Sequence, residues 1–334
     1  MRSFVHALPK VELHVHLVGS AGIDTVLTLA RRHPEAGVPT DRAELERFYT
    51  FRDFDHFLKV YWAVQSMLKD RDDIHTLVVG LATELARQNV RYAEVTVTPY
   101  NHITDGMPGD EVLAGLTSGR EVAAGMGVEL AWCFDIPGEK GLEAARDTLA
   151  FALTERPEGL VSFGLAGPEV GIGRAQFAPF FDAARDAGLH CVPHAGETSG
   201  PETIWSAVRD LRAERIGHGT SCVEDPALVE HLVQKGIPLE VCPTSNVRTR
   251  QVASIEAHPV RQMLDAGVVV TLNTDDPPFF RATLEGEYLA VASALDLTHS
   301  EVARLAENAV LASFLPNPRK TALLEEISSV LAAV

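Results

Sequence analysis

The sequence has few cysteines and a shortage of positive charge. Its four cysteines, Cys133, Cys191, Cys222 and Cys242, form no C-x-x-C pair, which favours buried thiols in a reducing compartment over a disulfide framework. Lysine and arginine number 29 against 46 acidic residues, giving a net charge of -17, so neither nucleic acid nor an anionic membrane is expected as a partner. No apolar run is long enough to span a bilayer, and MRSFVHALPK lacks the apolar core of a signal peptide. These shortages predict a cytoplasmic protein.

Short apolar or alternating segments recur along the chain, and helical patterns separate most of them. They predict eight strands, at residues 11–17, 90–99, 128–136, 160–167, 190–197, 215–221, 238–246 and 268–277. Alternating strands and helices favour parallel pairing with right-handed crossovers. Eight such units in 334 residues predict an α/β fold of the (β/α)8 barrel type.

Two stretches exceed what a plain barrel needs. The gap at 18–89 is too long for one crossover, and 299–334 follows the last predicted strand, so extra helices are expected in both. No linker, repeat or low-complexity tract interrupts the chain, which predicts a single domain over residues 1–334. A doubly wound sheet is the alternative architecture, but no G-x-G-x-x-G follows the first predicted strand.

Histidines and carboxylates lie at the carboxyl ends of several predicted strands. His14 and His16 are two apart in VELHVHL, so both side chains leave the same face of a strand. His194 and Asp275 occupy the corresponding ends of the fifth and eighth strands, and barrel enzymes gather their chemistry at that end. Three imidazoles and one carboxylate suit zinc or a similar divalent ion with one position open for water. Two histidines hydrogen-bonded inside a barrel core are the plainer alternative for H-x-H alone.

Three more polar residues accompany this set. Glu197 in HAGE is either a further ligand or a proton donor, and we favour proton transfer because four protein ligands already suffice. His218 stands between two glycines in IGHGT, which allows close approach of a substrate or water, although a packed turn histidine has the same context. Asp276 faces either a substrate or the start of a helix. An activated water together with an acid and a histidine is equipment for hydrolysis.

Together LPKVELHVHL, HAGE, IGHGT and NTDDP resemble the adenosine deaminase family of metal-dependent (β/α)8 hydrolases. The resemblance covers essentially the whole chain, including LAGPE at 165–169, CPTSN at 242–246 and SFL at 313–315. Each motif is weak alone, but their order and spacing make a specific match.

The resemblance implies a role for each candidate residue. One zinc ion per chain would be held by His14, His16, His194 and Asp275. Glu197 would protonate the purine nitrogen N1 as hydroxide adds to carbon C6. His218 would orient the attacking water and stabilise the developing charge. Asp276 would bind N7 and the backbone amide of Gly167 would face N3. The reaction would convert a 6-aminopurine into a 6-oxopurine and ammonia, so the expected partner is a small purine nucleoside.

Val18 departs from the family pattern. In the resembling family, members that act on adenosine carry an acidic residue at this position, and it binds the ribose hydroxyls. Two further positions also depart from the pattern: Thr96 and Asp135 stand where the family usually has basic residues. Some family members act on 6-aminodeoxyfutalosine of the futalosine route to menaquinone, whose benzoate-bearing extension replaces the 5′ hydroxyl. An apolar Val18 suits that extension, so we rank aminodeoxyfutalosine first, adenosine second and adenine third. Arg52, His56 and Lys59 are candidate anchors for the benzoate.

Two rival classes remain open. Another metal hydrolase on the same kind of barrel usually brings a bridging lysine or ligands for a second metal, and LAGPE offers no lysine. A non-catalytic purine-binding barrel predicts a missing ligand or acid, whereas every expected position is filled. The oligomeric state cannot be derived from the sequence.

Overall fold

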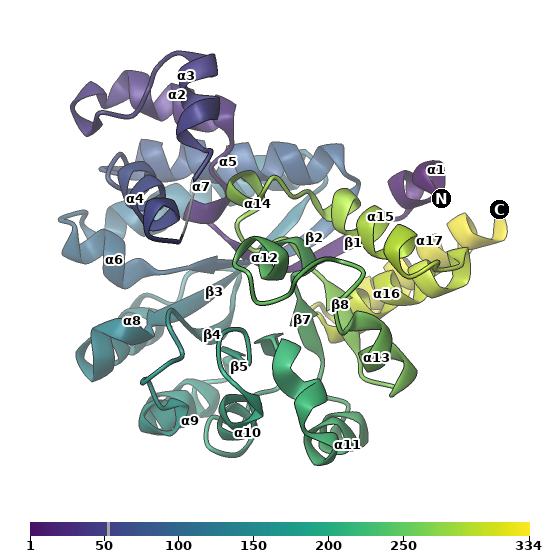
Figure 1. Ribbon diagram of the computed structural model, residues 1–334. Helices are drawn as coiled ribbons and strands as arrows, with labels where there is room; N and C mark the ends of the chain where they lie inside the picture. The colour runs from purple at the N-terminus through teal and green to yellow at the C-terminus, as the bar shows by residue number, and fades with distance from the viewer. Residues whose placement is uncertain (52–53) are drawn as a thin grey trace.

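The computed structural model describes residues 1–51 and 54–334 and contains an eight-stranded parallel barrel. Neighbouring strands pair in sequence order from first to last. The strands are β1 Lys10–His16, β2 Val90–Val97, β3 Glu129–Pro137, β4 Leu160–Ala166, β5 His190–Ala195, β6 Ile216–His218, β7 Leu239–Val241 and β8 Val270–Leu272. Figure 1 shows these strands at the centre with helices around them. The predicted fold class is confirmed.

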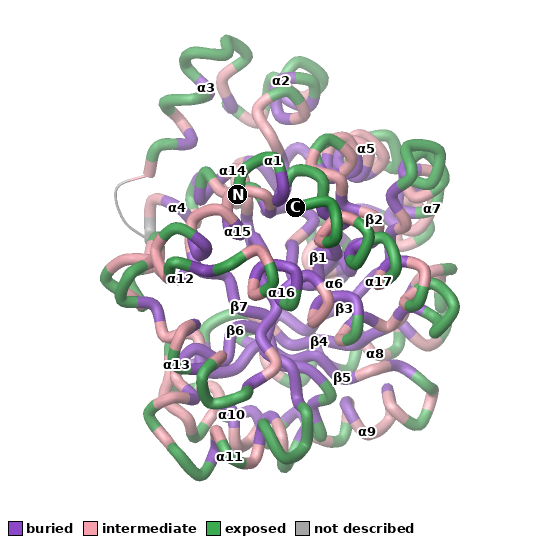
Figure 2. Tube along the Cα trace, turned by 90° about the vertical axis from the view of Figure 1, so that its right-hand side faces the viewer, coloured by how far each residue is buried: buried purple, intermediate pink, exposed green. Residues whose placement is uncertain are grey.

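Helices connect consecutive strands on the outside of the barrel, where their apolar faces cover it (Figure 2). From β2 to β8 the crossovers contain α6 Pro99–Thr104, α7 Gly109–Gly125, α8 Gly141–Glu155, α9 Ala178–Asp186, α10 Pro201–Arg209, α11 Pro226–Lys235, α12 Pro243–Arg248 and α13 Val260–Asp265. Short 3-10 turns precede or follow several of them, at Gly138–Lys140, Arg174–Phe177 and Thr220–Glu224. Among the described residues, no helix is both long enough and apolar enough to cross a membrane.

The extra helices lie where the long gaps predicted them. Between β1 and β2 the chain forms the 3-10 turn η1 Val18–Ser20, then α2 Ile23–Arg32, the turn Pro34–Ala36, α3 Arg42–Phe48, α4 Phe54–Gln65 and α5 Arg71–Arg87. After β8 come α14 Pro277–Phe280, α15 Leu284–Ala294, α16 His299–Ala312 and α17 Asn317–Ala332. The first helix, α1 Arg2–Ala7, contacts α17, and the two chain ends lie near each other (Figure 1).

The last three strands are shorter than the sequence predicted, and the prediction of strand through 246 is wrong. Residues 243–246 begin α12, because Pro243 occupies a first-turn position where its missing N–H costs no hydrogen bond. Pro277 begins α14 in the same way. The chain therefore leaves the barrel directly after β7 and β8, and the polar residues that follow these strands lie in tight turns at its rim.

Candidate metal centre and active site

The predicted ligands converge at the carboxyl end of the barrel. His16 Nε2 lies 3.2 Å from His194 Nε2 and 3.3 Å from Asp275 Oδ1, and His14 Nε2 lies 3.8 Å from the same oxygen. Two ligand atoms bound tetrahedrally to one zinc ion are roughly 3.4 Å apart. His14 Nε2 is buried without a hydrogen-bond partner among the described residues. This spacing and this unpaired nitrogen fit a divalent ion.

Asp275 is fixed by the closure of the barrel. Its backbone N–H donates to His14 O at 2.9 Å, its carbonyl accepts from His16 N–H at 3.0 Å, and Val15 pairs with it in a parallel bridge. Its φ of 65° is left-handed, a conformation that costs a non-glycine residue energy and is concentrated at functional sites. Ser245 Oγ donates to Oδ2 at 2.6 Å. The hydrogen bonds that close β1 onto β8 thus also set the separation of the ligands.

A buried charge network lies beneath the ligands, and the sequence analysis missed it. His14 Nδ1 is 2.8 Å from Glu240 Oε2, so this carboxylate orients the ring. Arg215 makes ion pairs with both Glu240 and Glu94, and all three side chains are at most 2% exposed. Burial opposes protonation of His14, but the hydrogen bond and charge of Glu240 outweigh burial and raise its pKa. The one available signal was a glutamate inside each of two apolar strands and an arginine directly before a third.

Glu197 follows β5 in a loop that a second glutamate holds in place. The carboxylate of Glu169 accepts backbone N–H bonds from Gly196, Glu197 and Thr198 at 2.9, 2.8 and 3.2 Å. It also accepts from Thr203 Oγ1 at 2.9 Å. Burial, followed by the charges of Asp275 and Glu169, raises the pKa of Glu197 to about 8. This upward shift favours the protonated form of Glu197, which a proton donor requires. Glu169 belongs to LAGPE, but its sequence context did not reveal this role.

His218 faces the same point from β6. Its Nε2 lies 3.6 Å from Glu197 Oε2 and 4.0 Å from Asp275 Oδ2. The residue has a left-handed φ of 62°, and the preceding Gly217 has no room for a Cβ, which would lie 2.8 Å from His14 Cε1. Burial lowers the pKa of His218 to about 4, so its ring is neutral at physiological pH.

The residues predicted to face the purine lie around the same rim. Asp276 is buried, and its Oδ1 has no hydrogen-bond partner among the described residues. A Cβ at Gly19 would overlap this carboxylate, so the turn that begins with Val18 lies against Asp276. Gly167 follows β4 with a φ of 86°. Val18 is buried.

The inserted helix α4 packs over this rim. Phe57 and Tyr61 on α4 have ring centroids 5.5 and 5.9 Å from that of Phe279, three residues after Asp276. Of the candidate anchors for a benzoate, Lys59 is exposed on α4 and His56 is on the same helix. Arg52 lies outside the described residues.

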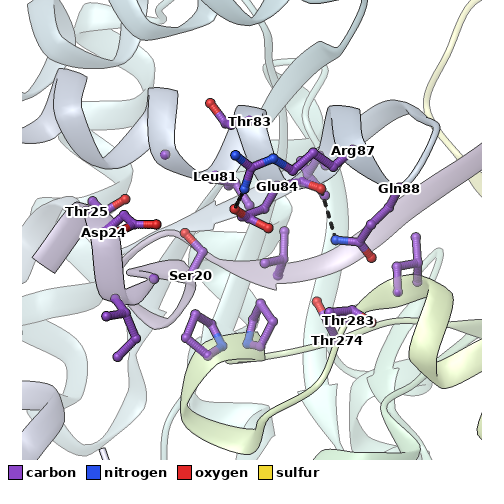
Figure 3. Close-up of a pocket in the computed structure, with 18 of the residues that line it drawn as sticks. Ser20, Asp24, Thr25, Leu81, Thr83, Glu84, Arg87, Gln88, Thr274 and Thr283 are labelled. Atoms are coloured by element: carbon purple, nitrogen blue, oxygen red, sulfur yellow. Dashed lines mark hydrogen bonds and ion pairs between the residues drawn. The ribbon is translucent and has the colours of Figure 1, made fainter. Parts of the chain in front are cut away.

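A cavity of ≈ 460 Å³ lies outside the barrel, behind the turns that carry Val18 and Asp276 (Figure 3). Ser20 and Thr274 line it from these turns, and Asp24, Glu84 and Arg87 line it from α2 and α5. It contains none of the predicted site residues. A second, open cavity of ≈ 920 Å³ begins at Glu197 and extends over the turns after β5, β6 and β7.

Comparison with known proteins decides the family. A sequence profile described as adenosine deaminase matches residues 9–330. The chain belongs to the adenosine deaminase family. This family member is 52% identical to an aminodeoxyfutalosine deaminase of Streptomyces avermitilis, over 100% of this chain and 94% of the relative. It is 37% identical to an adenine deaminase of Sinorhizobium medicae, over 95% of this chain and 97% of the relative.

Two solved structures have the same fold as this chain. Adenine deaminase from Arthrobacter aurescens superposes with a TM-score of 0.91 at 30% identity, covering 97% of this chain and 99% of that one. An amidohydrolase from Burkholderia ambifaria, solved with bound zinc, has a TM-score of 0.89 at 27% identity, covering 100% of this chain and 95% of that one. The predicted family resemblance is therefore confirmed.

Proposed function

We propose that this chain is a zinc-dependent aminohydrolase that converts 6-aminodeoxyfutalosine into its 6-oxopurine product and ammonia. One observation carries the reaction type: three imidazoles and a carboxylate converge beside the half-buried Glu197, whose pKa is raised to about 8. A divalent ion held by His14, His16, His194 and Asp275 would supply an activated water as the nucleophile. The unit that does this is a single domain over residues 1–334.

The chain's own residues complete the hydrolysis. Glu197 donates its proton to N1 as the oxygen of water adds to C6, and one proton of that water returns to the Glu197 carboxylate. The C6–N bond then breaks as the amino group takes up the second water proton and leaves as ammonia, with the oxygen left as the 6-oxo group. Asp276 holds N7. Burial, followed by the charges of Asp275 and Glu197, raises the pKa of Asp276 well above its usual range, which favours the protonated form that can donate to N7. The backbone N–H of Gly167 faces N3. His218 orients the attacking water.

The choice of substrate rests on two observations. Relatives named aminodeoxyfutalosine deaminase, from Streptomyces avermitilis and Streptomyces coelicolor, are 52% and 50% identical to this chain over its full length. Val18 is an apolar residue at the position where a carboxylate would repel a benzoate, and α4 contacts the turn that begins with it. Adenosine and adenine are the alternative substrates. We place the enzyme in the cytoplasm with a small purine nucleoside as its partner, and with no role for nucleic acid or membrane.

A kinetic comparison of the three substrates tests this proposal. The purified zinc-loaded protein is assayed for ammonia release from aminodeoxyfutalosine, adenosine and adenine. We expect kcat/KM to be highest for aminodeoxyfutalosine, by about tenfold or more over adenosine, because Val18 gives the 5′ hydroxyl no partner. A preference for adenosine or adenine would overturn the substrate assignment, and no turnover of any of the three would overturn the reaction type.

A further inference from the structure

Two buried side chains, Asn246 and His258, lie behind His218 on the side away from the metal ligands. Asn246 is on α12 and His258 precedes α13. The amide nitrogen of Asn246 is 3.4 Å from His218 Nδ1. Its amide oxygen is 3.1 Å from His258 Nε2 and 3.3 Å from Thr220 Oγ1. These contacts form a continuous hydrogen-bonded chain from α13 to the active site.

A backbone N–H group determines which atom donates and which accepts in each of these hydrogen bonds. The N–H of Val260 donates to His258 Nδ1 at 3.2 Å. A backbone N–H can only donate, so His258 Nδ1 is an acceptor, and in a neutral imidazole the proton is then on Nε2. His258 Nε2–H therefore donates to the Asn246 amide oxygen, which also accepts from the hydroxyl of Thr220.

The amide orientation then determines the state of His218. With its oxygen facing two donors, Asn246 presents its NH2 group to His218 Nδ1, which must accept. In the neutral ring the single proton is then on Nε2, the nitrogen that faces Glu197 and Asp275. A ring in this form has no lone pair on Nε2 and can only donate from it.

We propose that Asn246 and His258 are positioning residues that hold His218 as its Nε2–H tautomer. His218 then donates a hydrogen bond to the attacking oxygen and stabilises charge on it, instead of removing its proton. This inference rests on the proposed hydrolytic function. It adds two residues to the reaction, neither of which touches the substrate.

One isosteric substitution can reverse the donor and acceptor roles along this series of hydrogen bonds. Asn246→Asp replaces the NH2 group with an acceptor, so His218 must donate from Nδ1 and presents a bare Nε2 to the attacking oxygen. Loss of one preorganised donor to a developing charge reduces kcat by roughly 10²–10³-fold. We expect this loss in kcat with little change in KM and with zinc content unchanged. The matched control is Gln251→Glu, an amide-to-acid change at an exposed residue that lines the cavity of ≈ 920 Å³ together with His258. This control variant should keep normal kcat.

Nitrogen NMR of histidine rings reads the tautomer directly, independently of turnover. In the zinc-loaded wild type, His218 should show a protonated Nε2 and an unprotonated Nδ1, and Asn246→Asp should exchange them. A proton on Nδ1 of wild-type His218 would overturn the proposal. So would normal kcat in a folded Asn246→Asp variant. Kinetics use whichever 6-aminopurine the wild type turns over best, so a wrong substrate leaves this test intact.

Substitutions at His258 provide a second test of the proposal in which Asn246 is unchanged. His258→Phe removes the donor to the amide oxygen and should lower kcat by about tenfold, since the Asn246 amide loses one of its two orienting bonds. His258→Gln offers an N–H to the same oxygen and should restore most of that loss. Equal kcat in His258→Phe and His258→Gln would contradict the proposal that His258 positions His218 through Asn246.

Discussion

Arg215 is buried beneath the predicted metal ligands, and its replacement provides a quantitative test of the network there. The guanidinium pairs with Glu94 and Glu240, and its Nη1 donates to Ala312 O at 2.8 Å. It also stacks 4.3 Å above the ring of Phe314, whose backbone N–H donates to Glu94 at 2.8 Å. SFL at 313–315 is thus tied to the floor of the site. Arg215→Met keeps an unbranched apolar side chain in place of the aliphatic part of arginine and removes the charged guanidinium.

The cost follows from what the change leaves behind. Removing one partner of a buried ion pair costs about 3–5 kcal/mol, because the remaining charge has no compensation. Arg215 neutralises two carboxylates and both stay buried, so we expect the free energy of unfolding to fall by about 4–5 kcal/mol. Glu240 also loses the cation that holds it against His14, and loss of such support typically weakens metal binding 10–100-fold.

Urea unfolding of the metal-free protein, followed by circular dichroism, measures the first effect, and competition with a chromogenic zinc chelator measures the second. Arg146→Met, at an exposed arginine paired with Glu143 and Asp147, is the control and should change neither. Adding Glu94→Gln to Arg215→Met removes one uncompensated carboxylate and should restore part of the stability. A single variant within about 1 kcal/mol of wild type, or a double variant less stable than the single, would refute this account.

Three further predictions concern the metal, the acid and the substrate. Elemental analysis should find about one zinc-like ion per chain, and the His14→Ala/His16→Ala double variant should lose it; two ions, or retention in the double variant, would refute the ligand set. Glu197→Gln keeps the shape but cannot protonate N1, so kcat should fall by about 10² or more with zinc retained; near-normal turnover would remove Glu197 from the mechanism. Val18→Asp should shift kcat/KM toward adenosine relative to aminodeoxyfutalosine by roughly 10–100-fold, from a charge-assisted bond of ~1.5–3 kcal/mol; an unchanged ratio would mean that Val18 only packs.

The parts of the fold that the sequence predicted are those set by local pattern. All eight strands lie where alternation and flanking turns predicted them, and His14 and His16 share a face because residues two apart in a strand do so. The ends of β7 and β8 were misjudged because CPTSN and NTDDP directly follow apolar runs and were read as part of the strands, whereas their prolines start helices. A run of apolar residues predicts a strand, but it does not predict the residue at which backbone pairing with the neighbouring strand ends.

The supporting residues could not be predicted because their partners are distant in the chain. Glu240 is 226 residues from His14 and Arg215 is 121 from Glu94. A buried glutamate in an apolar strand has the same local pattern whether it orients a ligand or pairs elsewhere. Glu169 was within a quoted motif, yet only the fold reveals that its carboxylate collects the N–H groups of the HAGE loop.

Barrel closure connects these observations. β1 meets the turn after β8 through backbone hydrogen bonds that join Asp275 to His14 and His16. The first and last strands therefore cannot separate without moving these three predicted metal ligands. Asp275 and His218 both keep a left-handed backbone that a non-glycine residue adopts at a cost. The surrounding structure offsets that cost. Backbone hydrogen bonds to β1 hold Asp275, and the tightly packed Gly217 and Gly219 flank His218. The precision of the site therefore comes from the closed barrel, while specificity is left to the turns and inserted helices at its rim.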